Sequence, residues 1–456
     1  MPELTYRTRI AAAAEDVFAW HARPGAFERL TPPWERAEVV ERTSGIQNGD
    51  RVVVKTGVGP FIVRWVAEHF DYIEGRQFRD RQIHGPFSKW VHTHRFEPTG
   101  PDASFLEDCI EFALPFGAIG NFLGKNFTLR KLNRMFAYRH RTTAHDLATH
   151  NFYKGGRAMN ILVTGANGLI GSALVPFLTT GGHDVRRLVR GRASLNNNEY
   201  FWDPYSGNID KACLEGVDVL VHLSGENIAG RWTAEKKKKL RDSRVISTRL
   251  LSQTLAGMPK PPKVFVCASA MGYYGHRGDE ILQEESAPGK GFLADTVQEW
   301  ERQVEPAIKK GIRVVNLRTS IVLSAKSGAL KEMLLPFKMG IGGVFGSGEQ
   351  YWSWIGIDDV VGVIYHSIQT GSLSGPVNVA SPNPVTNREF TKTLGRVLSR
   401  PTIFSVPAAA ARLVLGEMAE ELLLSSIRVE PKNLIGTGYS FRFPELDGAL
   451  RHVLGK

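Results

Sequence analysis

The segment 160–178, NILVTGANGLIGSALVPFL, constrains the fold of this chain more than any other stretch. An apolar run leads directly into Gly165, Gly168 and Gly171, and a helical pattern follows. In such a turn the first glycine permits the bend, the second lets the backbone approach a pyrophosphate, and the third lets helix and strand pack closely. Exposed amides at the helix start, together with the helix dipole, stabilise phosphate charge. The segment therefore predicts a strand–turn–helix unit that binds a dinucleotide.

The next predicted strand, within HDVRRLVRGRA, distinguishes between the two nicotinamide dinucleotides. NAD-binding versions of this unit place Asp or Glu at the end of that strand to bind the ribose 2′-hydroxyl. Arg190 occupies this place, 19 positions beyond Gly171, and Arg192 follows. A guanidinium suits a 2′-phosphate, which a carboxylate would repel. NADP(H) is therefore favoured over NAD(H), and the alternative is a surface arginine on a basic protein.

The predicted cofactor contacts come from the glycine turn and from the ends of the strands that should lie beside it. Small residues after the strand DVLVH would let the ribose on the nicotinamide side pass. The predicted set is Gly165, Asn167, Gly168, Leu169, Ile170, Gly171, Arg190, Arg192, Leu223, Ser224, Gly225, Glu226 and Ala268.

Two patterns of hydrophobicity divide the chain near residue 150. Before it, LTYRTRI, RVVVKTGVG, FIVRWVAEHFDYI, SKWVHTHRFEP and ASFLEDCIEFAL alternate as antiparallel strands do, and a helix with an apolar stripe follows from about Gly117 to Leu147. After it, apolar strands alternate with helices, which indicates a doubly wound parallel sheet. We predict an α+β domain over 1–150, a linker over 151–158, an NADP-binding Rossmann domain over 159–400 and a C-terminal lobe over 401–456 that covers the cleft.

Composition excludes several functional classes. The formal charge of +11 favours anionic partners, but no aromatic residues interleave with the lysines of 235–244, so nucleic-acid binding is not predicted. No run approaches the roughly 20 apolar residues that cross a bilayer. Cys109, Cys213 and Cys267 are too few and too scattered for a disulfide framework or a metal cluster, so we predict no metal site and a cytoplasmic location.

From Met159 onward the chain resembles the extended short-chain dehydrogenases/reductases, in their atypical epimerase-like branch with its own small C-terminal domain. The phrases LSGENIAGRWTAEKKKKLRDSRVISTRLL, SAMGYYG and LLPFKMGIGGVFGSGEQYWSWIGIDD support this resemblance. It implies NADP(H) binding and does not supply a substrate.

Residues 3–148 resemble the START-like, helix-grip domains of the polyketide-cyclase-like branch, in element order and in the phrase VFAWHARPGAFERLTPPW. This second resemblance implies a pocket for an apolar small molecule, and a packed core without ligand is the alternative.

The parent dehydrogenase family uses a Tyr-x-x-x-Lys pair as its acid and base, and the 456 residues contain no such pair. FLADT, which begins at Phe292, lies at the corresponding place. We predict Ser269, Tyr273 and Tyr274 as substitute catalytic residues, with Glu301 as a further candidate, and expect Arg318 to brace the C-terminal lobe.

The sequence is thus consistent with an oxidoreductase or epimerase-like enzyme acting on a small molecule. The alternative is a non-catalytic NADP(H)-responsive sensor or binding protein.

Overall fold

The computed structural model describes residues 2–43, 45–58, 61–153 and 157–456. The chain divides into two compact units, one built mainly from residues 1–156 and the other mainly from residues 157–454. The predicted linker 151–158 is helical at its start, because helix α3 (Gly117–Phe152) continues five residues beyond Leu147. Residues 154–156 of that linker lie outside the described residues.

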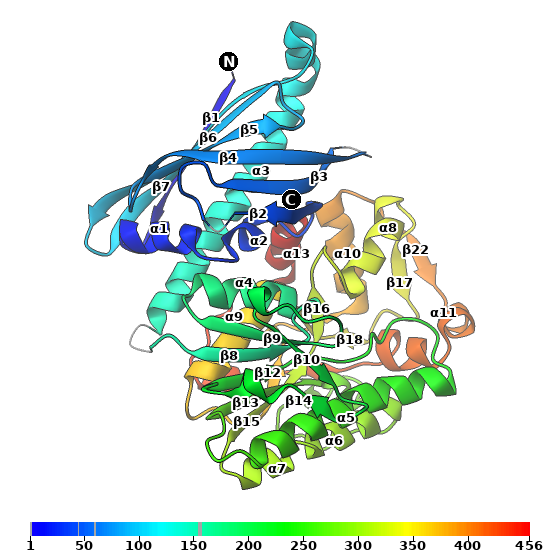
Figure 1. Ribbon diagram of the computed structural model, residues 1–456. Coiled ribbons are helices and arrows are strands. Elements are labelled where there is room, and N and C mark those ends of the chain that lie inside the picture. The colour runs from blue at the N-terminus through cyan, green and yellow to red at the C-terminus, as the bar shows by residue number, and fades with distance from the viewer. Residues whose placement is uncertain (1, 44, 59–60, 154–156) are drawn as a thin grey trace. The chain divides into compact units, whose positions relative to one another are not determined.

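The N-terminal unit contains a seven-stranded antiparallel sheet in the order β1-β7-β6-β5-β4-β3-β2 (Figure 1). Alternate residues of β7 are buried, which gives the sheet one inward face, as the alternating sequence pattern predicts. Two strands that we did not predict, β2 and β5, complete the sheet. The strands are β1 (Glu3–Ile10), β2 (Ala37–Arg42), β3 (Arg51–Val58), β4 (Phe61–Ile73), β5 (Gln77–His84), β6 (Lys89–Gly100) and β7 (Ala103–Ala113).

Helices α1 (Ala14–Ala22), α2 (Ala26–Leu30) and α3 pack on the inward face of this sheet. The predicted apolar stripe of α3 is correct only in the middle of the helix, where Leu132 and Phe136 are buried and Met135 is partly buried. It is wrong in the first turns, because Ile119, Phe122 and Leu123 are 70%, 87% and 75% exposed. The cyan start of α3 extends past the strands in Figure 1, which leaves these side chains without a sheet to pack on.

The second unit contains an eight-stranded sheet in the order β11-β10-β9-β8-β12-β13-β15-β20. All neighbouring pairs are parallel except β10–β11, so the predicted Rossmann-type α/β fold is confirmed. The strand order reverses between β8 and β12, which is where such sheets bind ligands. The strands are β8 (Asn160–Thr164), β9 (Asp184–Val189), β10 (Glu199–Asp203), β11 (Asn208–Ile209), β12 (Val219–His222), β13 (Val264–Ala270), β15 (Arg313–Thr319) and β20 (Gly375–Val379).

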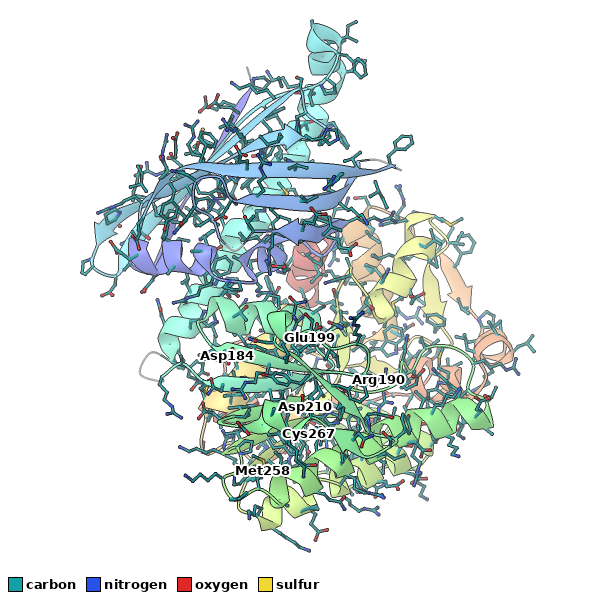
Figure 2. All side chains as sticks on the ribbon, in the orientation of Figure 1. Asp184, Arg190, Glu199, Asp210, Met258 and Cys267 are labelled. Atoms are coloured by element: carbon teal, nitrogen blue, oxygen red, sulfur yellow. The ribbon has the colours of Figure 1, made fainter. Side chains whose placement is uncertain are left out.

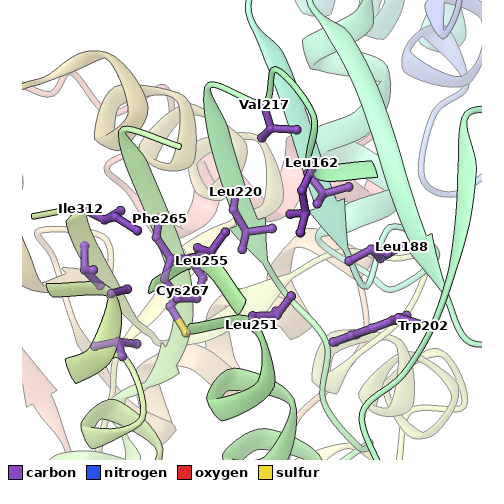
Figure 3. Packing of buried hydrophobic residues seen from close by; sticks show 14 of the residues in the cluster. Leu162, Leu188, Trp202, Val217, Leu220, Leu251, Leu255, Phe265, Cys267 and Ile312 are labelled. Atoms are coloured by element: carbon purple, nitrogen blue, oxygen red, sulfur yellow. The ribbon is translucent and has the colours of Figure 1, made fainter. Parts of the chain in front are cut away.

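The larger core cluster lies between this sheet and helices α5 (Ala234–Ala256), α6 (Phe292–Arg302) and α7 (Glu305–Lys309). Figure 3 shows Leu220 and Phe265 on neighbouring strands and Leu251 and Leu255 on α5. Helix α9 (Ile357–Gln369) is buried along almost its whole length. Because helices cover the faces of the sheet, polar groups of the sheet reach solvent chiefly at the ends of the strands.

The remaining helices and short strands lie between and after the strands of this sheet in the chain. The helices are α4 (Gly171–Thr180), α8 (Ala329–Lys338), α10 (Asn387–Leu398), α11 (Ala408–Leu415), α12 (Lys432–Gly436) and α13 (Leu446–Leu454). The short strands are β14 (Ile281–Leu282), β16 (Ile321–Leu323), β17 (Gly343–Phe345), β18 (Tyr351–Trp352), β19 (Trp354–Gly356), β21 (Val385–Thr386), β22 (Phe404–Val406) and β23 (Arg428–Val429). Within the described residues, no helix is both long enough and apolar enough to span a bilayer.

Candidate functional site

The three glycines of the turn between β8 and α4 have three different structural requirements. Gly165 has φ +69°, and a Cβ there would lie 2.7 Å from the Leu223 carbonyl carbon. A Cβ on Gly171 would lie 2.3 Å from the Gly165 carbonyl oxygen, so backbone contact excludes any side chain. Gly168 is exposed, and a Cβ there would meet only the Gly165 oxygen, at 3.2 Å. The fold therefore needs Gly165 and Gly171, whereas Gly168 keeps the surface of the turn open.

The residues of the turn next to Gly168 differ in exposure. Asn167 and Gly168 are exposed, whereas Leu169 and Ile170 are half-buried against the apolar cluster of the second unit. The amide of Gly168 donates to the Gly165 oxygen at 2.9 Å and closes the turn. The turn has the shape that brings backbone amides to a diphosphate.

Arg190, labelled in Figure 2, follows the last residue of β9 directly. Both Arg190 and Arg192 are exposed. The acidic residue of β9 is Asp184, at the opposite end of the strand. Positive charge from Arg190 helps to lower the pKa of Asp203 and of Glu226, although a hydrogen bond is the larger cause in each case. No carboxylate therefore stands at the residue where NAD-binding units carry one, and a guanidinium is available there.

The end of β12 adds a basic residue that the sequence analysis missed. Gly225 is exposed, and a Cβ built on it would lie 3.3 Å from the Arg244 guanidinium carbon. Arg244 comes from α5 and donates to the Glu226 carbonyl oxygen at 3.1 Å, and burial lowers its pKa to about 10. The Glu226 carboxylate accepts from Lys236 at 2.7 Å, which lowers its pKa. Because Arg244 lies 19 residues along the chain from Gly225, only the fold could reveal this neighbour.

Ser269, at the end of β13, belongs to a buried ionic network. Its Oγ donates to Glu301 Oε1 at 2.6 Å. Arg318, on the adjacent strand β15, donates to both oxygens of Glu301, from Nε at 2.9 Å and from Nη2 at 2.8 Å. The side chains of Arg318 and Glu301 are 4% and 14% exposed. Arg318 also donates to the Glu284 carbonyl oxygen. We expected it to brace the C-terminal lobe, but these contacts join it to Glu301, Tyr274 and Glu284, which lie before that lobe in the chain.

The two neighbouring tyrosines have different environments. We predicted both as substitute catalytic residues, and of the two only Tyr273 is partly exposed. Tyr274 is fully buried; its hydroxyl donates to Asn378 at 2.7 Å and accepts from Arg318 at 3.1 Å, and burial raises its pKa to about 12. Tyr273 is half-buried, and the Arg318 guanidinium lies 3.5 Å from its ring centroid. Only Tyr273 can present a phenol to a ligand without unfolding its loop.

Apolar residues occupy the start of α6, where the parent family has its tyrosine and lysine. The Phe292 ring lies 5.4 Å from Trp232, and Leu293 lies against Gly272. Both belong to an apolar cluster with Met418 and Leu422 of the C-terminal lobe. The Glu421 carboxylate accepts from the Phe292 and Leu293 amides, at 2.8 and 2.9 Å. The lobe therefore covers the start of α6, and the acidic group that it brings there, Glu421, accepts hydrogen bonds from two backbone amides.

The inward face of the N-terminal sheet is less apolar than the predicted pocket requires. Aromatic residues line much of it, including Phe78, Trp90 and Phe112. Between them lie buried or largely buried ionisable groups from β5, β6, β7 and α3, namely Asp80, His92, His94, Asp108 and His140. We predicted no metal site, but among the described residues Asp80, His92 and His94 lie close enough together that they could hold a metal ion.

Three family models match the chain. Residues 161–380 match the NAD dependent epimerase/dehydratase family. Residues 10–137 match polyketide cyclase / dehydrase and lipid transport, and residues 406–453 match a domain of unknown function. Both resemblances found in the sequence are thereby confirmed.

Curated relatives share the second unit. An epimerase family protein of Mycobacterium bovis is 42% identical over 294 residues, which cover 64% of this chain and 97% of that protein. The human epimerase family protein SDR39U1 is 34% identical over 301 residues, which cover 65% of this chain and all of the relative.

Two solved structures are similar to this chain. A nucleoside-diphosphate sugar epimerase from Corynebacterium glutamicum aligns with 99% of this chain and 90% of its own, at 33% identity and a TM-score of 0.82. Human SDR39U1 (isoform 2), solved with NADPH, aligns with 65% of this chain and 99% of its own, at 33% identity and a TM-score of 0.59.

Proposed function

Since this chain belongs to the NAD-dependent epimerase/dehydratase family, as one of its epimerase family proteins, we propose that it binds NADP(H) and transfers hydride to or from a small molecule. The observation that supports this most is the glycine turn with its open Gly168, together with Arg190 where a carboxylate would otherwise stand. The relative that was solved with NADPH adds support for the phosphorylated cofactor.

In this proposal the chain's own residues bind and orient the cofactor. Exposed backbone near Asn167 and Gly168 would hold the diphosphate, and Arg190 with Arg192 would bind the 2′-phosphate by charge-assisted hydrogen bonds. Gly225 leaves room beside β12, with Arg244 adding positive charge. The remaining predicted contacts, Leu223, Ser224 and Ala268, line the ends of β12 and β13. The cofactor supplies the hydride, and the C-terminal lobe would help to exclude water from the reacting atoms.

Reversing the charge at Arg190 tests the choice of cofactor. Arg190→Asp is expected to weaken NADPH binding about 10- to 100-fold and to leave NADH binding almost unchanged, because charge-assisted hydrogen bonds are worth about 1.5–3 kcal/mol. Isothermal titration calorimetry measures both affinities. The control is Arg302→Asp, which makes the same charge change at the exposed end of α6. An equal loss for NADPH and NADH would refute the assignment of the 2′-phosphate.

We assign the proton transfer to Tyr273, which is half-buried. Ser269 is buried and donates its one hydroxyl proton to Glu301, so we give it the role of holding the ionic network beside Tyr273. Tyr273→Phe is expected to lower kcat about 10²- to 10⁴-fold with little change in NADPH affinity, because positioned acids contribute about that much. The assay follows oxidation of NADPH with a panel of quinones, aldehydes and ketones. The matched control, Tyr274→Phe, is expected to reduce thermal stability while leaving kcat much closer to the parent value. An unchanged kcat in Tyr273→Phe would remove this residue from the mechanism.

The apolar start of α6 favours a second candidate function. Phe292 and Leu293 can neither move a proton nor hold a ribose, so the chain could be a non-catalytic NADP(H)-responsive binding protein. Tight NADPH binding without turnover on any member of the panel would favour this second function.

We further propose that the N-terminal unit binds a small molecule that is apolar over most of its surface. The match to polyketide cyclase / dehydrase and lipid transport and the aromatic inward face support this proposal.

A further inference from the structure

Strand register brings three ligand-bearing residues together on the inward face of the N-terminal sheet. His92 and His94 are two residues apart on β6, so both side chains point to the same face. Asp80 on β5 lies directly opposite His92 in the antiparallel ladder. On the other side of β6, Asp108 of β7 lies directly opposite His94. Four ionisable side chains from three neighbouring strands therefore occupy one small area.

The nitrogens nearest to Asp80 come from both histidines. Asp80 Oδ2 lies 3.2 Å from His92 Nδ1 and 3.8 Å from His94 Nε2. Each of the three residues offers one ligand atom, and these atoms all lie within 4.8 Å of one another. Tetrahedral ligands with bonds of about 2.0–2.1 Å are separated by about 3.3 Å, so small side-chain rotations would complete the set.

The opposite nitrogens of both imidazoles face a second carboxylate. His92 Nε2 lies 2.9 Å and His94 Nδ1 2.7 Å from Asp108 Oδ1, although the His94 N–H is not aligned for a hydrogen bond. The other oxygen, Asp108 Oδ2, lies 2.6 Å from His140 Nε2 of α3. A carboxylate behind a histidine is the usual partner of a metal-bound imidazole, because it fixes the ring and raises the basicity of the ligating nitrogen.

These ionisable groups are buried, and they offset one another's charge through close carboxylate–imidazole contacts. The side chains of His92, Asp108 and His140 are 4%, 4% and 2% exposed, and buried charges are expensive unless they are paired or coordinate a metal. Asp80 and His94 are more open, at 14% and 10%, so this side of the cluster can be reached by an ion.

From this geometry we propose that Asp80, His92 and His94 bind one divalent transition-metal ion, such as Zn²⁺, with Asp108 and His140 as supporting residues. Two imidazoles and one carboxylate suit Zn²⁺ and its neighbours in the first transition row rather than Mg²⁺ or Ca²⁺, which prefer oxygen ligands. Three protein ligands leave a fourth position open on the tetrahedral ion. A water molecule or a polar group of a bound ligand can take that position.

Metal titration of the full chain tests the proposal. Protein stripped with EDTA is titrated with Zn²⁺ by calorimetry, and with Co²⁺ by its visible absorption, which reports coordination geometry. We expect one ion per chain, with no comparable binding of Mg²⁺. Asp80→Asn and His94→Ala are expected to weaken Zn²⁺ binding at least about 100-fold, and Asp108→Asn about 10- to 100-fold. Affinity should fall as pH is lowered, because protons compete for the imidazoles and the carboxylate.

The matched control is His84→Ala. His84 lies on the same strand as Asp80 but is exposed, so its removal should leave stoichiometry and affinity unchanged. Circular dichroism and melting curves establish that each variant is folded, and if His94→Ala unfolds, the nearly isosteric Asp80→Asn decides. Two results would overturn the proposal: no stoichiometric Zn²⁺ site in the parent protein, or Zn²⁺ binding that survives both Asp80→Asn and His94→Ala. Either result would show that these residues form only a buried ion-pair network.

Discussion

Gly168→Ala is expected to weaken NADPH binding about 100-fold while the protein stays folded. The added methyl group would meet one protein atom, the Gly165 oxygen at 3.2 Å, a tight contact that a backbone shift of a few tenths of an ångström would relieve. It would occupy the exposed surface of the turn, where the cofactor's diphosphate has to approach the backbone. Calorimetry with NADPH and a thermal melt, made on the same preparation, measure the two effects separately.

Two other glycines of the second unit are the controls for this prediction. Gly191→Ala adds a methyl group that meets nothing within 4 Å, so both affinity and melting temperature should be unchanged. Gly171→Ala puts its methyl group 2.3 Å from the Gly165 oxygen, so it should lower stability as well as affinity. Full NADPH affinity in Gly168→Ala would mean that the diphosphate does not lie on this turn.

Arg318→Met is expected to destabilise the second unit by about 3–5 kcal/mol. The substitution leaves the Glu301 carboxylate, which is 14% exposed, without the guanidinium that donates to both of its oxygens. Breaking one partner of a buried ion pair has a cost of this size, because the remaining charge is desolvated and unpaired. Tyr274 would lose one hydrogen-bond donor as well. Urea unfolding at neutral pH measures the change.

An exposed pair in the same unit provides the comparison. Arg412 and Glu420 form an ion pair of similar length, but both side chains are more than half exposed. Arg412→Ala should therefore cost less than about 1 kcal/mol. A similarly small loss in Arg318→Met would show that the network around Glu301 contributes little to stability, and Arg318 would then be available for a substrate.

The geometry of the proposed cofactor site was predictable because its residues are close together in the sequence. Gly165 to Gly171 lie in one turn, and the position of Arg190 follows from a single strand length. The catalytic half was less predictable. Tyr273 and Tyr274 are adjacent in the sequence, and only packing decides that one hydroxyl is buried. Arg244 lies on α5, and no local sequence pattern indicates that its guanidinium lies beside Gly225.

The N-terminal cluster was missed for a specific reason. Its carboxylate Asp80 lies on β5, QFRDRQIH, a strand so rich in charge that its alternation of apolar and polar residues is weak. Because β5 was not predicted, its pairing with β6 could not be predicted either. The position of Asp80 opposite His92 depends on the register of that pairing. On β6, His92 and His94 are separated by one residue, which puts both imidazoles on one face of the strand but does not reveal a third ligand.

Calorimetric titration of the full chain with NADPH, and then with NADH, tests the central claim most directly. We predict one NADPH bound per chain, more tightly than NADH, through the open turn at Gly168 and the guanidinium of Arg190. No heat with either dinucleotide, or a preference for NADH, would contradict this account of the site.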